Sequence, residues 1–232
     1  MPVKQLRLLK VFYLFLMLSL SHLLIAGETH PHDIEAAKQF INEALKVNKS
    51  YISKNGQAFF KKLSKGQQPR ATIVGCADSR AQTNKLSDSP EGDIFMIRNI
   101  GNQVRSTMGS VQYGINHLAS PVLLIIGHSN CGAISAASSD YSSLEKDIQK
   151  ELRTINISKG IKNINGVIKN VNNQVEIAST EFNNKLSNDE ILIVGAVYDF
   201  ANDMKQGPGK LNIININGKT NPVEIKQILS NL

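Results

Sequence analysis

The chain has no concentrated run of lysine and arginine, although it carries a formal net charge of +7. Three positive charges come from Lys4, Arg7 and Lys10 in residues 1–26, where no acidic residue occurs, so the remainder carries +4. Nucleic-acid-binding proteins usually gather their basic residues on one element or one face. The charge distribution therefore does not support nucleic-acid binding, and we expect no nucleic-acid partner.

Internal repeats and low-complexity blocks are also absent from the sequence. A hydrophobic content of 41% and a charged content of 19% lie near the averages for globular proteins, which excludes wholesale disorder. A length of 232 residues is enough for one substantial α/β domain with a buried core, or for two small ones.

The N-terminal segment has the pattern of a signal peptide. Three basic residues precede an apolar run over 11–20 and a second over 23–26, and Ala26 and Gly27 offer a cleavage point. We predict that residues 1–26 are a signal peptide and that the protein is an exported bacterial protein, periplasmic or secreted. A retained membrane anchor is the alternative, because the apolar stretch is nearly long enough to span a bilayer.

Cysteine is scarce, because Cys76 and Cys131 are the only two in the chain. In an exported protein two cysteines invite a disulfide, so a redox protein with one Cys76–Cys131 bond is one hypothesis. The residues around each cysteine favour another interpretation, which depends on the order of the elements.

Apolar runs and helical patterns alternate along the chain. Periodicity predicts helices over 33–64 (ending in a separate short helix), over 107–119 and in parts of 140–185. Four short apolar runs and one edge segment predict strands over 71–75, 94–97, 122–126, 191–197 and 210–216. The alternation predicts an α/β fold whose mainly parallel central sheet has four strands plus an edge strand, with helices on both faces. We expect a single domain over 27–232 with an N-terminal helical arm over about 33–64.

Cys76 and His128 each come directly after an apolar run, and Cys131 follows on the same short loop as His128. Sites in parallel sheets form at the carboxyl ends of strands, so these side chains are candidates for one crevice. Two thiolates and one imidazole suit Zn²⁺, and three protein ligands leave a fourth position open, as in catalytic zinc sites. We therefore predict that Cys76, His128 and Cys131 bind zinc.

An acidic and a basic residue, Asp78 and Arg80, stand two and four positions after Cys76. A carboxylate so near a metal thiolate needs a cation to keep it ionised and fixed, and arginine can grip it with two hydrogen bonds. A solvated surface pair is the alternative, but this pair directly follows a buried strand.

Residues 76–80, Cys-Ala-Asp-Ser-Arg, and 127–132, Gly-His-Ser-Asn-Cys-Gly, resemble the two-part signature of β-class carbonic anhydrases. The segments 92–102, 109–115 and 194–199 also match that family, and the similarity covers roughly residues 35–217.

The resemblance implies the β-carbonic anhydrase fold and one Zn²⁺ per subunit, bound by Cys76, His128 and Cys131. It also implies that Asp78 and Arg80 form a catalytic dyad. The implied reaction is the reversible hydration of CO2 to bicarbonate and a proton, in which zinc-bound hydroxide attacks CO2 in an apolar pocket. Asp78 would accept a hydrogen bond from the hydroxide and orient it.

The resemblance further assigns residues to substrate binding. Gln67 matches a glutamine that reaches into the site of the neighbouring subunit, so a homodimer or homotetramer is expected. Phe95, Ile100 and Tyr113 match apolar pocket residues, and Gly132 matches a glycine whose N–H faces the substrate.

Two alternatives to a carbonic anhydrase stay open besides the redox protein. A hydrolase on the same fold would act on a CO2 analogue such as carbon disulfide. A non-enzymatic zinc protein would have Asp78 as its permanent fourth ligand. We expect contact with a membrane only if the leader is retained.

Overall fold

The computed structural model describes residues 34–231, so the expected signal peptide over 1–26 lies outside the described residues. The described chain falls into two units, 34–59 and 60–231. The first unit is most of α2 (Ile34–Leu63), which breaks at Gly56, where φ is 71°. The break separates a short C-terminal helix from a long one, as the sequence predicts.

The second unit is built around a five-stranded sheet with the strand order β2-β1-β3-β4-β5. Strands β1 to β4 run parallel, and β5 pairs with β4 in the antiparallel direction at the edge. The predicted α/β architecture is therefore confirmed. The strands are β1 (Ala71–Cys76), β2 (Ile94–Asn99), β3 (Val122–His128), β4 (Leu192–Asp199) and β5 (Lys210–Ile216).

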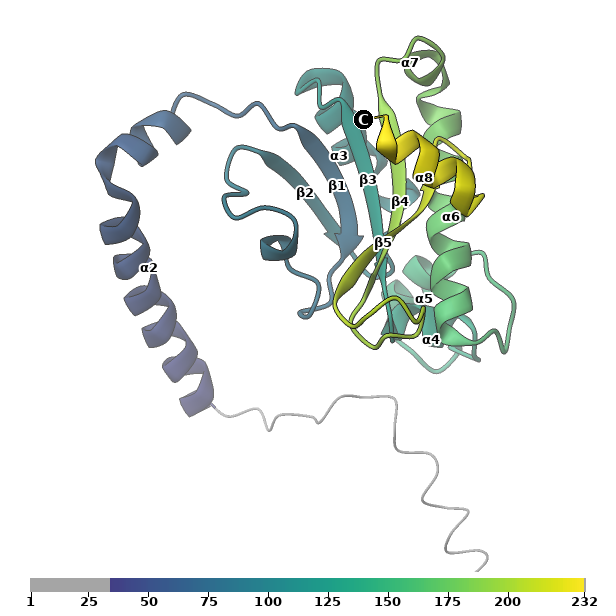
Figure 1. The fold of residues 1–232 in the computed structure, drawn as a ribbon. Coiled ribbons are helices and arrows are strands. Elements are labelled where there is room, and N and C mark those ends of the chain that lie inside the picture. Colours follow the sequence, from purple (N-terminus) through teal and green to yellow (C-terminus); the bar gives the residue numbers. More distant parts are fainter. Residues whose placement is uncertain (1–33, 232) are drawn as a thin grey trace, which may run out of the picture. The chain divides into compact units, whose positions relative to one another are not determined.

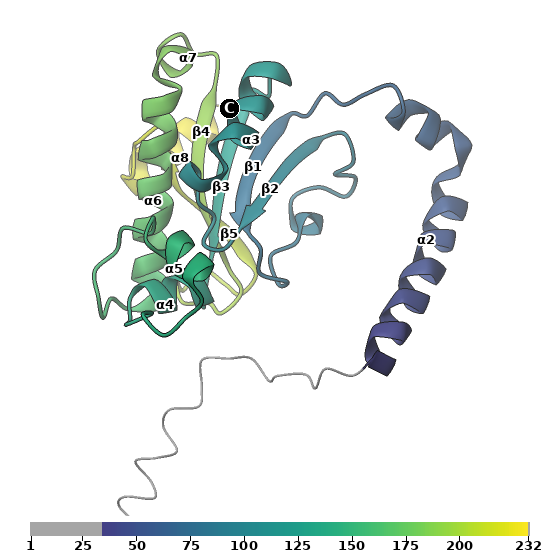
Figure 2. The ribbon, with the colours of Figure 1, turned by 180° about the vertical axis from the view of Figure 1, so that it is seen from behind.

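Helices lie on both faces of this sheet (Figures 1 and 2). One face packs against α6, whose buried side chains meet those of β3 and β4, and the other carries α8 beside β5. The helices of the second unit are α3 (Met108–Gln112), α4 (Gly132–Ala137), α5 (Lys146–Leu152), α6 (Asn163–Glu181), α7 (Asn183–Ser187) and α8 (Pro222–Ser230). No helix in residues 34–231 combines the length and the apolar character that a membrane crossing needs.

Two helical segments differ from the sequence expectation. The helix expected over 107–119 is split into a 3₁₀ turn (Arg105–Thr107), α3 and a π turn (Tyr113–His117). In the π turn, the backbone of Gly114 lies so close to β1 that a Cβ atom there would overlap the hydroxyl of Thr72. Helix α8 is an addition, and its start follows a recognisable cap in which the Asn221 side chain accepts from the Val223 N–H.

The carboxyl ends of the parallel strands meet at one edge of the sheet. Strand β1 ends at Cys76, β3 ends at His128 and β4 ends at Asp199. The strands that lead to this edge pack into the core through fully buried side chains such as Leu123, Ile125 and Ile193. The fold therefore presents the two predicted strand-end ligands on a rigid platform.

Candidate metal centre

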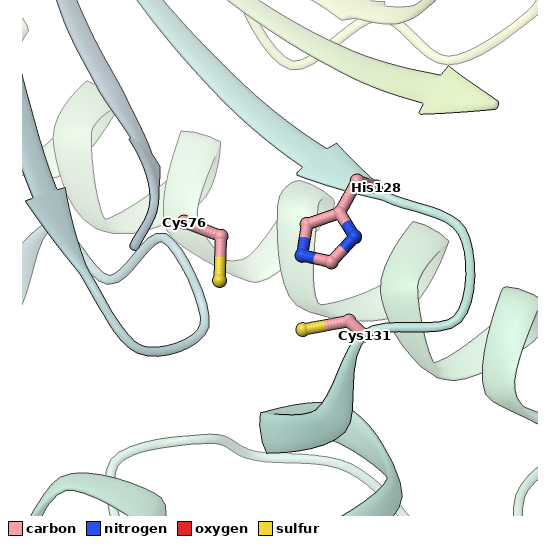
Figure 3. Close-up of side chains that lie close together, drawn as sticks. All are labelled: Cys76, His128 and Cys131. Carbon is pink, nitrogen blue, oxygen red and sulfur yellow. The ribbon is translucent and has the colours of Figure 1, made fainter. Parts of the chain in front are cut away.

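Three buried side chains converge at this edge (Figure 3). One ligand atom from each of Cys76, His128 and Cys131 lies within 4.8 Å of the others. Cys76 is the last residue of β1, His128 is the last residue of β3, and Cys131 immediately precedes α4. The predicted grouping of these residues is therefore present in the structure, and neither cysteine is in a disulfide.

The imidazole of His128 is set up to offer a lone pair to the group. Its Nδ1 lies 2.9 Å from the carbonyl oxygen of Ser129. A carbonyl only accepts, so Nδ1 carries a proton, and whenever the ring is neutral its lone pair lies on Nε2. Nε2 is buried and has no hydrogen-bond partner. A buried nitrogen is seldom left without a partner, and a metal ion beside the two sulfur atoms would supply one.

The thiol of Cys131 donates a hydrogen bond to the sulfur of Cys76, so the two sulfur atoms are close enough to bind one cation. A hydrogen bond donated by Cys131 lowers the pKa of Cys76 to about 4, against the effect of burial, and the N–H of Gly101 contributes in the same direction. The same hydrogen bond, together with burial, raises the pKa of Cys131. A divalent cation in place of that proton would favour the thiolate form of both residues. The donor set therefore fits Zn²⁺.

Asp78 and Arg80 form a two-point ion pair beside this group. Arg80 Nε lies 2.8 Å from Asp78 Oδ1, and Arg80 Nη2 lies 2.7 Å from Oδ2. Asp78 Oδ2 is 3.8 Å from Nε2 of His128. The hydrogen bond from Arg80 lowers the pKa of Asp78 to about 2, despite partial burial. An ionised acceptor is thus held next to the candidate metal position.

Arg98 is a site residue that the sequence reasoning missed. Its guanidinium donates to the carbonyl oxygens of Cys76 at 3.0 Å and Asp78 at 2.6 Å, and to the side chain of Gln82 at 2.9 Å. Arg98 therefore fixes the backbone of the loop that carries one sulfur ligand and the carboxylate. The signal was a charged residue inside the otherwise apolar strand β2.

Phe200 is a second residue that was missed. Its ring stacks on that of His128 with a centroid distance of 5.8 Å, and the guanidinium carbon of Arg80 lies 4.6 Å from its centroid. Phe200 directly follows β4, but an aromatic residue at a strand end has no chemical signature of its own, so its sequence position alone did not identify it.

The five predicted substrate-binding residues divide into two groups. Gly132 directly follows Cys131, and Ile100 directly precedes Gly101, whose N–H faces the sulfur of Cys76. These two residues lie at the candidate metal centre.

Gln67, Phe95 and Tyr113 are not at the metal centre of their own chain. A substrate pocket built within one subunit would need them there. Phe95 pairs with Thr72, four residues before Cys76, which is about 13 Å along the strand. Tyr113 packs on Phe95 with ring centroids 5.8 Å apart. Gln67 precedes β1 altogether and lines a surface hollow with residues 62–70 and 87–93. The physical reason is the parallel sheet, which separates its amino and carboxyl ends.

A family model described as carbonic anhydrase matches residues 71–205. Carbonic anhydrase 2 of Mycobacterium tuberculosis is 41% identical over 76 residues, which is 32% of this chain and 37% of the relative. A carbonic anhydrase of Emericella nidulans is 33% identical over 118 residues, or 46% of this chain and 52% of the relative. The chain therefore spans about a third to a half of the length of these curated relatives.

Solved structures show the same fold at low sequence identity. A tetrameric β-carbonic anhydrase from Sordaria macrospora gives a TM-score of 0.64 at 22% identity, covering 78% of this chain and 98% of the other. A Coccomyxa β-carbonic anhydrase in complex with acetazolamide gives 0.58 at 23% identity, covering 84% and 89%.

Proposed function

This chain belongs to the carbonic anhydrase family, and on that premise we propose that it catalyses the zinc-dependent, reversible hydration of CO2 to bicarbonate and a proton. The observation that carries the proposal is the buried Cys76–His128–Cys131 group, in which Nε2 of His128 has no partner and an ionised carboxylate lies 3.8 Å away.

Cys76, His128 and Cys131 would hold one Zn²⁺ per subunit. When bound, the ion would supply a Lewis acid that makes water nucleophilic at neutral pH. The Nδ1–H of His128 keeps its donor bond to Ser129, which fixes the orientation of the ring.

Asp78 would act as a hydrogen-bond acceptor that orients the attacking water. A pKa of about 2 means that the carboxylate is ionised at neutral pH and accepts a hydrogen bond rather than storing the proton. Arg80 holds both carboxylate oxygens and thereby fixes their direction. Gly132 and Ile100 would contact the substrate from the same chain.

A second copy of the chain would complete the substrate pocket. Gln67, Phe95 and Tyr113 lie away from the metal centre of their own chain. Gln67 and Tyr113 are exposed and accessible to a neighbouring chain, while Phe95 packs on Tyr113. We therefore propose a homodimer or homotetramer. The Sordaria relative, by its description, is tetrameric.

The function is tested on the purified full-length protein. We expect one zinc ion per chain by elemental analysis, CO2 hydration by stopped-flow assay, and loss and recovery of that activity when a chelator removes zinc and zinc is restored. His128→Ala should lose zinc, while His117→Ala, a change at an exposed histidine, should retain it.

Fully zinc-loaded protein without CO2 hydration would contradict the proposal. Hydrolysis of carbon disulfide by the same sample would then identify the alternative hydrolase. A metal-free protein with a Cys76–Cys131 disulfide would instead support the redox hypothesis.

We also propose that residues 1–26 direct export and are removed. The support is the sequence pattern of basic residues, apolar run and small residues. In a bacterial host we expect the mature protein in the periplasmic fraction or medium, with an intact mass that begins after Ala26. Recovery of uncleaved chain in the membrane fraction would show instead that the segment is an anchor.

A further inference from the structure

The ion pair beside the candidate metal centre is too exposed to hold its geometry alone. The side chain of Arg80 is 49% exposed, and that of Asp78 is 18% exposed. Ion pairs with so much access to water contribute little, because solvent screens them and a long arginine side chain has many other conformations. The backbone N–H of Arg80 holds Asp78 Oδ1 at 2.9 Å, so it is the two-point grip by the exposed Arg80 side chain that needs a further contact.

Phe200 provides such a contact through the face of its ring. The Arg80 guanidinium carbon lies over this ring, 4.6 Å from the centroid, within the range of a cation–π interaction. The contact leaves the N–H groups of the guanidinium available as donors. Those groups donate to Asp78 and, at 3.2 Å, to the carbonyl oxygen of Asn130.

The position of Phe200 is itself fixed by its neighbours in the chain. The buried carboxylate of Asp199 accepts from the N–H groups of Asp203 at 3.0 Å and Met204 at 2.7 Å. On the other side, the N–H of Ala201 donates to the hydroxyl of Ser129, the residue after His128. The turn that carries Phe200 is therefore tied to the loop that carries the histidine ligand.

We propose that Phe200 is a positioning residue for the hydration reaction, which holds Arg80 on Asp78 while stacking on His128. The ring contacts both a predicted metal ligand, His128, and Arg80, the residue that orients the carboxylate. The effect of Phe200 on catalysis rests on the proposed function. Its effect on the position of Arg80 does not rest on that function.

The test measures Arg80 directly on the zinc-loaded protein. Phenylglyoxal modification of each arginine is followed by mass spectrometry, with the exposed Arg105 as the internal reference. Phe200→Leu keeps an apolar side chain and removes the aromatic ring. We expect the rate at Arg80, relative to Arg105, to rise about fivefold and kcat for CO2 hydration to fall about fivefold, with zinc content unchanged. Phe200→Tyr should restore both values.

Phe182→Leu is the matched control, because it makes the same change in a buried core position on the α6 side of the sheet. It should lower stability without changing the rate at Arg80. Unchanged Arg80 reactivity in a folded Phe200→Leu protein would overturn the proposal, as would failure of Phe200→Tyr to restore it. Wild-type protein that is zinc-loaded but inactive would overturn the proposed function, while the Arg80 rates would still decide the role of Phe200.

Discussion

Asp78 keeps its negative charge far into the acid range, because Arg80 donates to both of its oxygens and lowers its pKa to about 2. Replacement by Asn keeps the size of the side chain but removes the charge and one acceptor. We expect Asp78→Asn to reduce kcat for CO2 hydration on the order of 100-fold and to leave one zinc per chain. The measurements are stopped-flow hydration and elemental analysis of the same sample.

A different result would change the role of Asp78. Loss of stoichiometric zinc in the variant would mean that the carboxylate contributes to metal binding itself, as in the alternative with four protein ligands. Asp147→Asn, at an exposed acid on α5, is the control and should leave both values unchanged.

At the level of single residues, the ligand types could be predicted because their chemistry is local. Cys76 and His128 were identifiable as metal-binding types at strand ends, Cys131 by its place on the same short loop as His128, and Asp78 with Arg80 as a pair two residues apart. Phe200 could not be identified in the same way, because its contacts with His128 and Arg80 exist only once β4 is aligned next to β3. An aromatic residue has no chemical signature until its neighbours are known.

At the level of the elements, the buried strands were predictable because each is a short apolar run. The boundaries of β1 and β3 differ from expectation by one or two residues, since Cys76 and His128 are themselves part of the ladder. The split of the helix expected over 107–119 was not predictable. The π turn in it places Gly114 against Thr72, a contact between segments far apart in the sequence that periodicity does not encode.

Arg98, near the end of β2, leads to a prediction about the loop after β1 and its affinity for zinc. Arg98 donates to the carbonyl oxygens of Cys76 and Asp78, and methionine has a similar length but no donor. We expect Arg98→Met to weaken zinc binding by about 10- to 100-fold, because the ligand loop loses its two hydrogen bonds to a charged donor. Competition with a zinc chelator measures this affinity.

Arg70→Met is the matched control at the opposite end of the same strand pair. Arg70 also makes a two-point contact, to Asp93, but it lies before β1 and outside the metal centre. It should leave the zinc affinity unchanged. Equal affinities in wild type and Arg98→Met would show that the loop keeps its shape without Arg98.

At the scale of the whole molecule, the proposed site would have its two halves at opposite ends of the sheet of one chain. The metal-binding side chains lie at the carboxyl ends of the strands, whereas Gln67, Phe95 and Tyr113 lie near the amino ends. A pocket that uses both halves therefore needs two copies of the chain. The family resemblance predicted this division for Gln67, but hydrophobic periodicity does not reveal it for Phe95 and Tyr113, because it depends on which end of each strand a residue lies near.

Mixed oligomers test that division. One variant, His128→Ala, lacks the metal but keeps the donated side chains, and the other, Gln67→Ala combined with Tyr113→Ala, keeps the metal but lacks them. If each chain completes the site of its partner, half of the randomly mixed dimers contain one intact site, and about a quarter of the wild-type activity should return. Each variant mixed with itself is the control and should stay inactive. If every site were built from one chain, every chain in the mixture would carry a defect, and co-expression would recover no CO2 hydration.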